Sequence, residues 1–301
     1  MPEKTVCGPN ELADAITGFV VRKSGLPQAR VRSIIDDVIA EAGEGAVEGL
    51  QRRLAQPSEA WTYYERDPLA WRVHHRLAAV VLPEQPVVTG AAHLAAVAGR
   101  PHIIVANHLS YSDANVIEVL LQQCGCGGIA DRLAVVAGPK VYSDLTRRFS
   151  SLCFGTIKSP QNESVSSGQA AMSAREVALA ARQTLDAARA RMAAGDCILL
   201  FPEGTRSRTG GMQPFLPGVA RYFEDNDVPV VPVGLRGTEH MFAIGEERLG
   251  SARITMTVGP PLSSASIRAA TSGNRRRFVD ALGAAVAALL PPAYRGAYQS
   301  A

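Results

Sequence analysis

The sequence contains no long hydrophobic run. Nowhere in its 301 residues does an apolar stretch approach the ~18 residues that cross a bilayer, and the most apolar segment, 281–290, is shorter and ends at two prolines. The first ten residues are polar and lack the apolar core of a secretion signal. We therefore expect a cytoplasmic protein that does not span a membrane, with peripheral contact at the inner face of the cell membrane left open.

Lysine and cysteine are also scarce. The net charge of +3 is too small to indicate a nucleic-acid partner, so none is expected. The five cysteines are odd in number and form no pair of CxxC clusters, which disfavours a disulfide framework and a zinc site and fits a reducing cytoplasm. The chain also lacks a Walker A loop and a Gly-x-Ser-x-Gly elbow, which argues against a nucleotide hydrolase and an ordinary serine hydrolase.

The first part of the chain has the apolar spacing of amphipathic helices. Leu12, Ile16 and Phe19 share one helical face, and a second helix is predicted after Pro27. A further helical segment around 71–81 ends near a proline. The pattern predicts an N-terminal helical subdomain over residues 1–82.

Short β-rich runs dominate the rest of the chain, which we predict to be one α/β domain over residues 83–301. Ser173 and Glu176 have the spacing of a capping box at the start of a long helix, and a last helix is predicted to begin near Asn274. Strands alternating with helices favour a mostly parallel sheet flanked by helices on both faces. The predicted strands are 86–89, 102–106, 133–137, 152–157, 197–201, 228–235 and 254–258.

A histidine and an aspartate follow the predicted strand 102–106. His108 and Asp113 are five residues apart, and on a continuous helix such positions point ~140° apart, so they can meet only across a turn. A strand–loop–helix segment supplies that turn, and catalytic groups gather at such strand ends. A carboxylate on one imidazole nitrogen leaves the other nitrogen free to act as a base. The alternative is that both residues merely cap an ordinary loop.

A second polar loop follows the predicted strand 197–201. Gly204 permits close backbone approach, Thr205 offers a hydroxyl, and the guanidinium groups of Arg206 and Arg208 match the geometry of a phosphate. The loop is therefore a candidate phosphate site, and the alternative is a solvated turn with two surface arginines.

The two motifs together resemble the glycerolipid acyltransferase family, which includes lysophosphatidate and glycerol-3-phosphate acyltransferases. Asn107-His108-x4-Asp113 is followed, about ninety residues later, by Phe201-Pro-Glu-Gly-Thr-Arg206, and the resemblance extends over about 86–261.

The resemblance implies that His108 is the general base and that Asp113 orients it. It also implies that Glu203, Gly204, Thr205 and Arg206 form the acceptor site, with Arg206 on the phosphate. The implied donor is a fatty acyl thioester of coenzyme A or of acyl carrier protein, the acceptor is glycerol-phosphate-like, and neither a metal nor a bound cofactor is required.

The family's Gly-x-Ile segment, which often ends in an arginine, differs here. Gly155-Thr-Ile157 is followed by Lys158 with no nearby arginine, so Lys158 is the candidate cation. This leaves open a different acceptor, such as another lyso-lipid or an amino-lipid. A non-catalytic lipid-binding member of the fold also remains an alternative.

Two further features allow more than one interpretation. Basic residues near the first two helices suit attachment to anionic lipid, although a solvated helix face is the more common reason for such charges; these are Arg22, Lys23, Arg30 and Arg32. His74 and His75 have no carboxylate at ligand spacing in the sequence, so we expect a structural role for them.

Overall fold

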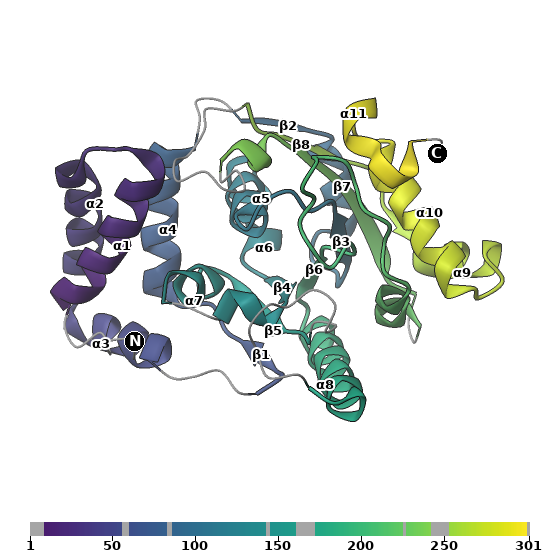
Figure 1. Ribbon diagram of the computed structural model, residues 1–301, viewed down its shortest axis with the longest axis horizontal. Coiled ribbons are helices and arrows are strands. Elements are labelled where there is room, and N and C mark those ends of the chain that lie inside the picture. Colours follow the sequence, from purple (N-terminus) through teal and green to yellow (C-terminus); the bar gives the residue numbers. More distant parts are fainter. Residues whose placement is uncertain are drawn as a thin grey trace.

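A nine-stranded sheet lies at the centre of the molecule, between helices that cover both of its faces (Figure 1). The computed structural model describes residues 9–55, 60–82, 86–142, 145–160, 172–224, 227–241 and 253–299. The predicted fold class, a mostly parallel α/β sheet with an N-terminal helical region, is confirmed.

The strand order is β1-β5-β4-β6-β3-β7-β8-β2, and β9 pairs with β7. The five strands from β5 to β7 run parallel, whereas β1, β8 and β9 pair antiparallel with their neighbours β5 and β7. The strands are β1 (Tyr63–Tyr64), β2 (Val87–Thr89), β3 (Ile103–Ala106), β4 (Leu133–Ala137), β5 (Gly155–Lys158), β6 (Cys197–Leu200), β7 (Pro229–Arg236), β8 (Thr255–Val258) and β9 (Leu262–Ser263).

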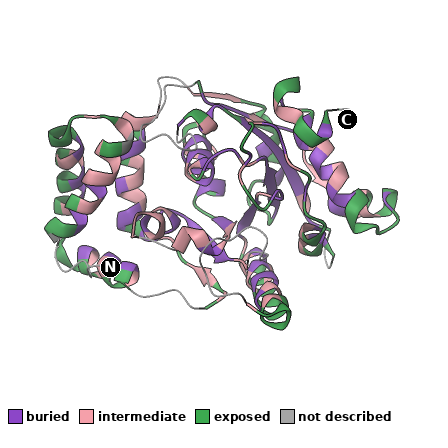
Figure 2. Ribbon diagram, in the orientation of Figure 1, coloured by how far each residue is buried: buried purple, intermediate pink, exposed green. Residues whose placement is uncertain are grey.

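Each face of the sheet has its own apolar core. Along β3, Ile104 and Ala106 pack into the core that contains α5 and the N-terminal helices, and Ile103 and Val105 pack into the core that contains α8 and α10. Because both faces are covered, the central strands are apolar throughout and buried (Figure 2). The α-helices are α1 (Pro9–Ser24), α2 (Gln28–Ala42), α3 (Glu44–Ala55), α4 (Pro68–Val81), α5 (Asp113–Gln123), α6 (Gly127–Ala130), α7 (Leu145–Ser151), α8 (Ala174–Ala193), α9 (Ser264–Ala270), α10 (Arg275–Ala287) and α11 (Pro292–Arg295).

The N-terminal region is less separate than its helical pattern indicates. It contributes β1, which pairs with the edge strand β5, and its apolar residues share one core with α5. Gly155 leaves room for the side chain of Tyr63, because a Cβ there would lie 2.7 Å from Oη of Tyr63 and 2.9 Å from the backbone oxygen of Leu133. A strand of two residues shows no periodicity in the sequence, so it was not predicted. The domain boundary near residue 82 stays a prediction.

Several local expectations are confirmed, and one needs correction. Ser173 and Glu176 form the predicted capping box, and Asn274 caps α10. The strand predicted over 152–157 begins at Gly155, because Leu152 to Phe154 form a turn after α7 that buries its apolar side chains in the core. The composition also predicts a polar loop over residues 159–168, most of which lies outside the described residues, which resume at residue 172.

No helix in the described ranges is both long enough and apolar enough to cross a membrane.

Asp67 fixes the start of α4 and provides a stability test. Its buried carboxylate accepts hydrogen bonds from the backbone N–H of Leu69 (2.9 Å) and Ala70 (3.1 Å) and forms an ion pair with Arg53 at 3.0 Å. Losing a helix N-cap typically costs about 1 kcal/mol, so we expect Asp67→Ala to lower the free energy of unfolding by about 1–2 kcal/mol in urea denaturation. Asp67→Asn keeps a cap acceptor and should lose less, and equal losses for the two variants would contradict the capping role.

Candidate active site

His108 and Asp113 meet across the turn that joins β3 to α5. Nδ1 of His108 lies 2.8 Å from Oδ2 of Asp113. The same carboxylate oxygen accepts hydrogen bonds from the backbone N–H of Leu109 (2.6 Å) and Ser110 (2.9 Å). Asp113 is fully buried at the first residue of α5, where the helix dipole favours a negative charge. The carboxylate therefore holds the imidazole through Nδ1 and leaves Nε2 for other chemistry.

Glu203 ties the second loop to the first. Its Oε1 accepts the backbone N–H of His108 at 2.8 Å, and its Oε2 accepts the backbone N–H of Gln213 at 2.7 Å. The backbone oxygen of His108 in turn accepts the N–H of Ser207 at 2.8 Å. Because β3 and β6 are parallel neighbours, both loops leave the same edge of the sheet, as the two motifs require.

Two more contacts place the His108 loop. The amide of Asn107 binds both backbone groups of Leu235, donating to its oxygen at 2.8 Å and accepting from its N–H at 2.7 Å, and so continues the β3–β7 ladder by one step. The ring of Phe201, at the end of β6, stacks on the imidazole of His108 with a centroid distance of 4.4 Å. Backbone, ring and carboxylate contacts together leave the imidazole little freedom to turn.

Arg206 lies on the His108 side of the second loop. Its guanidinium carbon lies 3.6 Å from the ring centroid of Tyr111, and Arg147 of α7 lies 4.9 Å from the same ring. Tyr111 follows His108 by three residues, so its ring places both guanidinium groups beside the first motif. Arg147 was not predicted as a site residue, because no local motif marks it and only the packing of α7 brings it here.

A cavity of about 1080 Å³ joins these groups. His108, Tyr111 and Glu203 line it, together with the predicted loop residues Gly204, Thr205, Arg206 and Arg208. Its lining includes five cationic side chains, Lys140, Arg147, Arg206, Arg208 and Arg221. Among the described lining residues Glu203 is the only acid, so the cavity favours an anion.

The cavity continues away from these charges as an apolar space. Side chains of α1, α4 and α5 line this part, among them Leu12, Ile16, Phe19, Leu77, Val81 and Val116. The N-terminal helices thus complete the wall of the cavity that contains the imidazole.

Lys158 is the predicted site residue that the structure separates from the others. It ends β5, is buried, and places its ammonium 4.7 Å from the ring centroid of Trp61 and 5.5 Å from that of Tyr142. It is not among the described residues that line the cavity. A role for Lys158 in binding the acceptor stays a prediction. In the structure, contacts with two aromatic rings stabilise the charge of its ammonium group.

The fold and the site define an α/β protein in which an imidazole–carboxylate pair faces an arginine-rich loop across one cavity. Residues 85–236, half of the chain, match the model of the family described as Acyltransferase. The chain therefore belongs to the acyltransferase family.

Curated relatives are similar over shorter segments. A 1-acyl-sn-glycerol-3-phosphate acyltransferase of Limnanthes douglasii is 36% identical over 67 residues, which cover 22% of this chain and 24% of that protein. One from Chlamydomonas reinhardtii is 34% identical over 105 residues, covering 35% and 30%. The chain thus matches between about a quarter and a third of the length of these relatives.

One solved structure covers nearly the whole chain. The crystal structure of the 1-acyl-sn-glycerophosphate (LPA) acyltransferase PlsC from Thermotoga maritima aligns with a TM-score of 0.47 and 20% identity. The alignment covers 91% of this chain and 95% of that one.

The Glu203 carboxyl gives a pH test of this geometry. Burial raises the pKa of Glu203 to about 7 from 4.5, against the lowering effect of the two backbone N–H groups and with a smaller raising effect from Asp113. The folded protein then holds this proton more tightly than the unfolded chain, so the resulting stability is present below about pH 4.5 and is lost as the pH rises through about 7.

The free energy of unfolding of the wild type, relative to that of Glu203→Gln, should accordingly fall between pH 5 and pH 8. The slope should not exceed about 1.4 kcal/mol per pH unit, the value for one proton. Urea denaturation of both proteins across this pH range measures the two free energies of unfolding. A difference between them that stays constant with pH would refute the raised pKa of Glu203.

Proposed function

We propose that the protein is an O-acyltransferase that moves a fatty acyl group from a thioester to a hydroxyl of lysophosphatidate or glycerol 3-phosphate. The observation that carries the proposal is the placement of the His108–Asp113 pair and of Arg206 on one cavity. The family of the chain and the names of its relatives support the same reaction.

The reaction needs one proton transfer in each direction. Nε2 of His108 accepts the proton of the acceptor hydroxyl while that oxygen attacks the thioester carbonyl carbon. The tetrahedral intermediate then breaks its carbon–sulfur bond, and the protonated imidazole returns the proton to the leaving thiolate. General-base help of this kind contributes roughly 10²–10⁴-fold. Asp113 stabilises the imidazolium that forms between the two steps.

Two arginines orient the acceptor in this proposal. Arg206 and Arg147 lie on the ring of Tyr111, three residues from the base, and arginine suits bidentate contact with phosphate. Arg147 thus takes the part that the sequence assigned to Lys158, whose ammonium lies among aromatic rings instead. A phosphate held by both guanidinium groups brings the acceptor hydroxyl to the imidazole.

The apolar part of the cavity suits an acyl chain. It lies between α1, α4 and α5, and most of the side chains that these helices contribute to it are aliphatic or aromatic, as in pockets that bury an apolar ligand. The donor is acyl-CoA or acyl carrier protein, and peripheral membrane contact stays part of the proposal. Of the basic residues suited to such contact, Arg32 is paired with Asp14 and Asp36.

Replacement of the base tests the mechanism directly. We expect His108→Ala to lower kcat by roughly 10²–10⁴-fold, because the hydroxyl keeps its proton at the moment of attack. Release of free thiol from acyl-CoA in the presence of acceptor measures the rate. His240→Ala is the matched control, since its side chain is 62% exposed and it should keep normal turnover. Normal turnover by His108→Ala would remove the base from the mechanism.

Replacement of the two arginines tests the phosphate site. Arg206→Ala and Arg147→Ala should each raise KM for a phosphorylated acceptor by about tenfold or more, since a hydrogen bond to a charged group is worth about 1.5–3 kcal/mol. Arg182→Ala, at a position on α8 whose side chain is 81% exposed, serves as the control and should leave this KM unchanged. An unchanged KM in both cavity variants would place the phosphate elsewhere.

A panel of acceptors separates the proposal from its alternatives. Lysophosphatidate, glycerol 3-phosphate and a lyso-amino-lipid, each tested with both donors, distinguish the phosphate acceptor from another polar head. Failure of every pair would favour a lipid-binding protein without this activity.

A further inference from the structure

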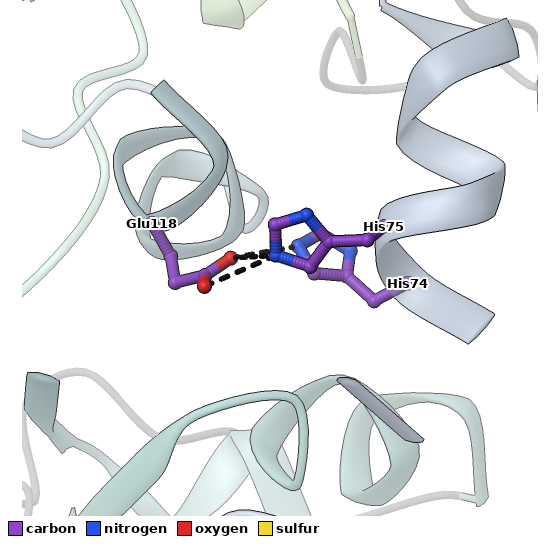
Figure 3. Close-up of side chains that lie close together, drawn as sticks. All are labelled: His74, His75 and Glu118. Carbon is purple, nitrogen blue, oxygen red and sulfur yellow. Dashed lines mark hydrogen bonds and ion pairs between the residues drawn. The ribbon is translucent and has the colours of Figure 1, made fainter. Parts of the chain in front are cut away.

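A second cluster of polar side chains lies between α4 and α5. His74 and His75 of α4 point toward Glu118 of α5 (Figure 3). Nε2 of His75 lies 2.8 Å from Oε2 of Glu118, and Nε2 of His74 lies 3.6 Å from the same oxygen. Glu118 is fully buried, and the two imidazoles are largely buried, with 14% and 23% of their side chains exposed. This cluster has no part in the proposed acyl transfer.

The carboxylate of Glu118 is suited to bind a cation. Burial by itself raises the pKa of Glu118, but contacts with His74, His75 and Trp71 outweigh it and lower the pKa to about 2. The group is therefore ionised at neutral pH. The indole N–H of Trp71 donates to Oε1 at 3.0 Å, and Nε2 of His75 lies 3.1 Å from the same oxygen. Oε2 is the oxygen that both imidazoles approach most closely. Carboxylates that bind metals commonly have one oxygen held by such a donor.

His74 supplies the second observation. Its Nε2 is buried and has no hydrogen-bond partner among the described residues, and 3.6 Å is too long for a hydrogen bond to Oε2. A metal ion bound at about 2.0–2.2 Å to each atom bridges nitrogen and oxygen atoms that are about 3–4 Å apart. The His74–Glu118 distance thus fits a bridging ion. The His75–Glu118 pair would open by a few tenths of an ångström as the ion replaces the proton between them.

We propose that His74, His75 and Glu118 bind one divalent transition-metal ion, of which Zn²⁺ is the best match. The candidate ligand atoms lie within 4.8 Å of one another. Two imidazoles and one carboxylate suit Zn²⁺ and its neighbours Co²⁺ and Ni²⁺, whereas Ca²⁺ and Mg²⁺ prefer oxygen ligands alone. Three protein ligands leave a fourth position for water.

Such an ion would join two parts of the molecule. α4 belongs to the N-terminal helical region, and α5 begins at Asp113, which orients His108. His74 also lines the wall of the cavity. The bound ion would therefore fasten the N-terminal helices to the helix that carries the site, and the folded protein would gain stability from it.

Trp71 provides a direct optical readout. Its ring lies tilted against that of His75 at a centroid distance of 4.5 Å. The chain has one other tryptophan, Trp61, and the substitution Trp61→Phe removes it from the signal. After dialysis against a chelator, Trp61→Phe is titrated with CoCl₂. We expect quenching of Trp71 fluorescence that saturates at one equivalent, and ZnCl₂ should compete with it.

Calorimetry with ZnCl₂ identifies the ligands. The wild type should bind one equivalent with micromolar or tighter affinity, and its thermal midpoint should rise with ZnCl₂ concentration. His75→Ala and the isosteric Glu118→Gln should weaken binding by roughly tenfold or more, because each removes a ligand atom or its charge. Circular dichroism confirms that both variants fold.

Two matched controls exclude other donors. His108→Ala removes another imidazole that lies beside a carboxylate, and Cys126→Ser removes a free thiol two residues from that of Cys124. Both should bind Zn²⁺ as the wild type does. The proposal is overturned if the wild type shows no quenching and no heat of binding, if His75→Ala and Glu118→Gln bind normally, or if either control loses binding.

Discussion

One carboxylate oxygen organises the candidate active site. Oδ2 of Asp113 accepts the imidazole Nδ1–H of His108 together with the backbone N–H of Leu109 and Ser110, so a single buried charge folds the turn and sets the ring. A buried charge is costly unless it is hydrogen-bonded. Here the three donors to Oδ2 belong to the loop itself, whereas Oδ1 has no hydrogen-bond partner among the described residues. The same hydrogen bonds that stabilise the turn therefore determine that Nδ1 faces the carboxylate and that Nε2 does not.

The second loop depends on the first through the backbone of His108. Glu203 accepts its N–H, and Ser207 donates to its oxygen, so the second loop cannot move independently of His108. Parallel pairing of β3 with β6 is what makes this contact possible, because it brings the carboxyl ends of both strands to one edge. The sheet thus acts as a rigid base for groups that are 95 residues apart in the chain.

The N-terminal helices have two relations to this centre. They supply much of the apolar wall of the cavity, and through His74 and His75 they contact Glu118 on the helix that begins at Asp113. Any force that shifts α4 relative to α5 is therefore transmitted to the helix behind the imidazole. The buried cluster and the cavity wall connect the stability of this region to the geometry of the site.

The sequence by itself determined the features that depend on local order. Apolar runs that end at Ala106 and at Phe201 marked two strand ends, and the spacing from His108 to Asp113 required a turn. Tertiary packing decided the rest: the two-residue strand β1, the approach of Arg147 to Tyr111, and the meeting of His75 with Glu118, 43 residues further along. Such contacts depend on how α4, α5 and α7 pack on the sheet, and packing between distant segments produces no periodicity or spacing that a linear sequence displays.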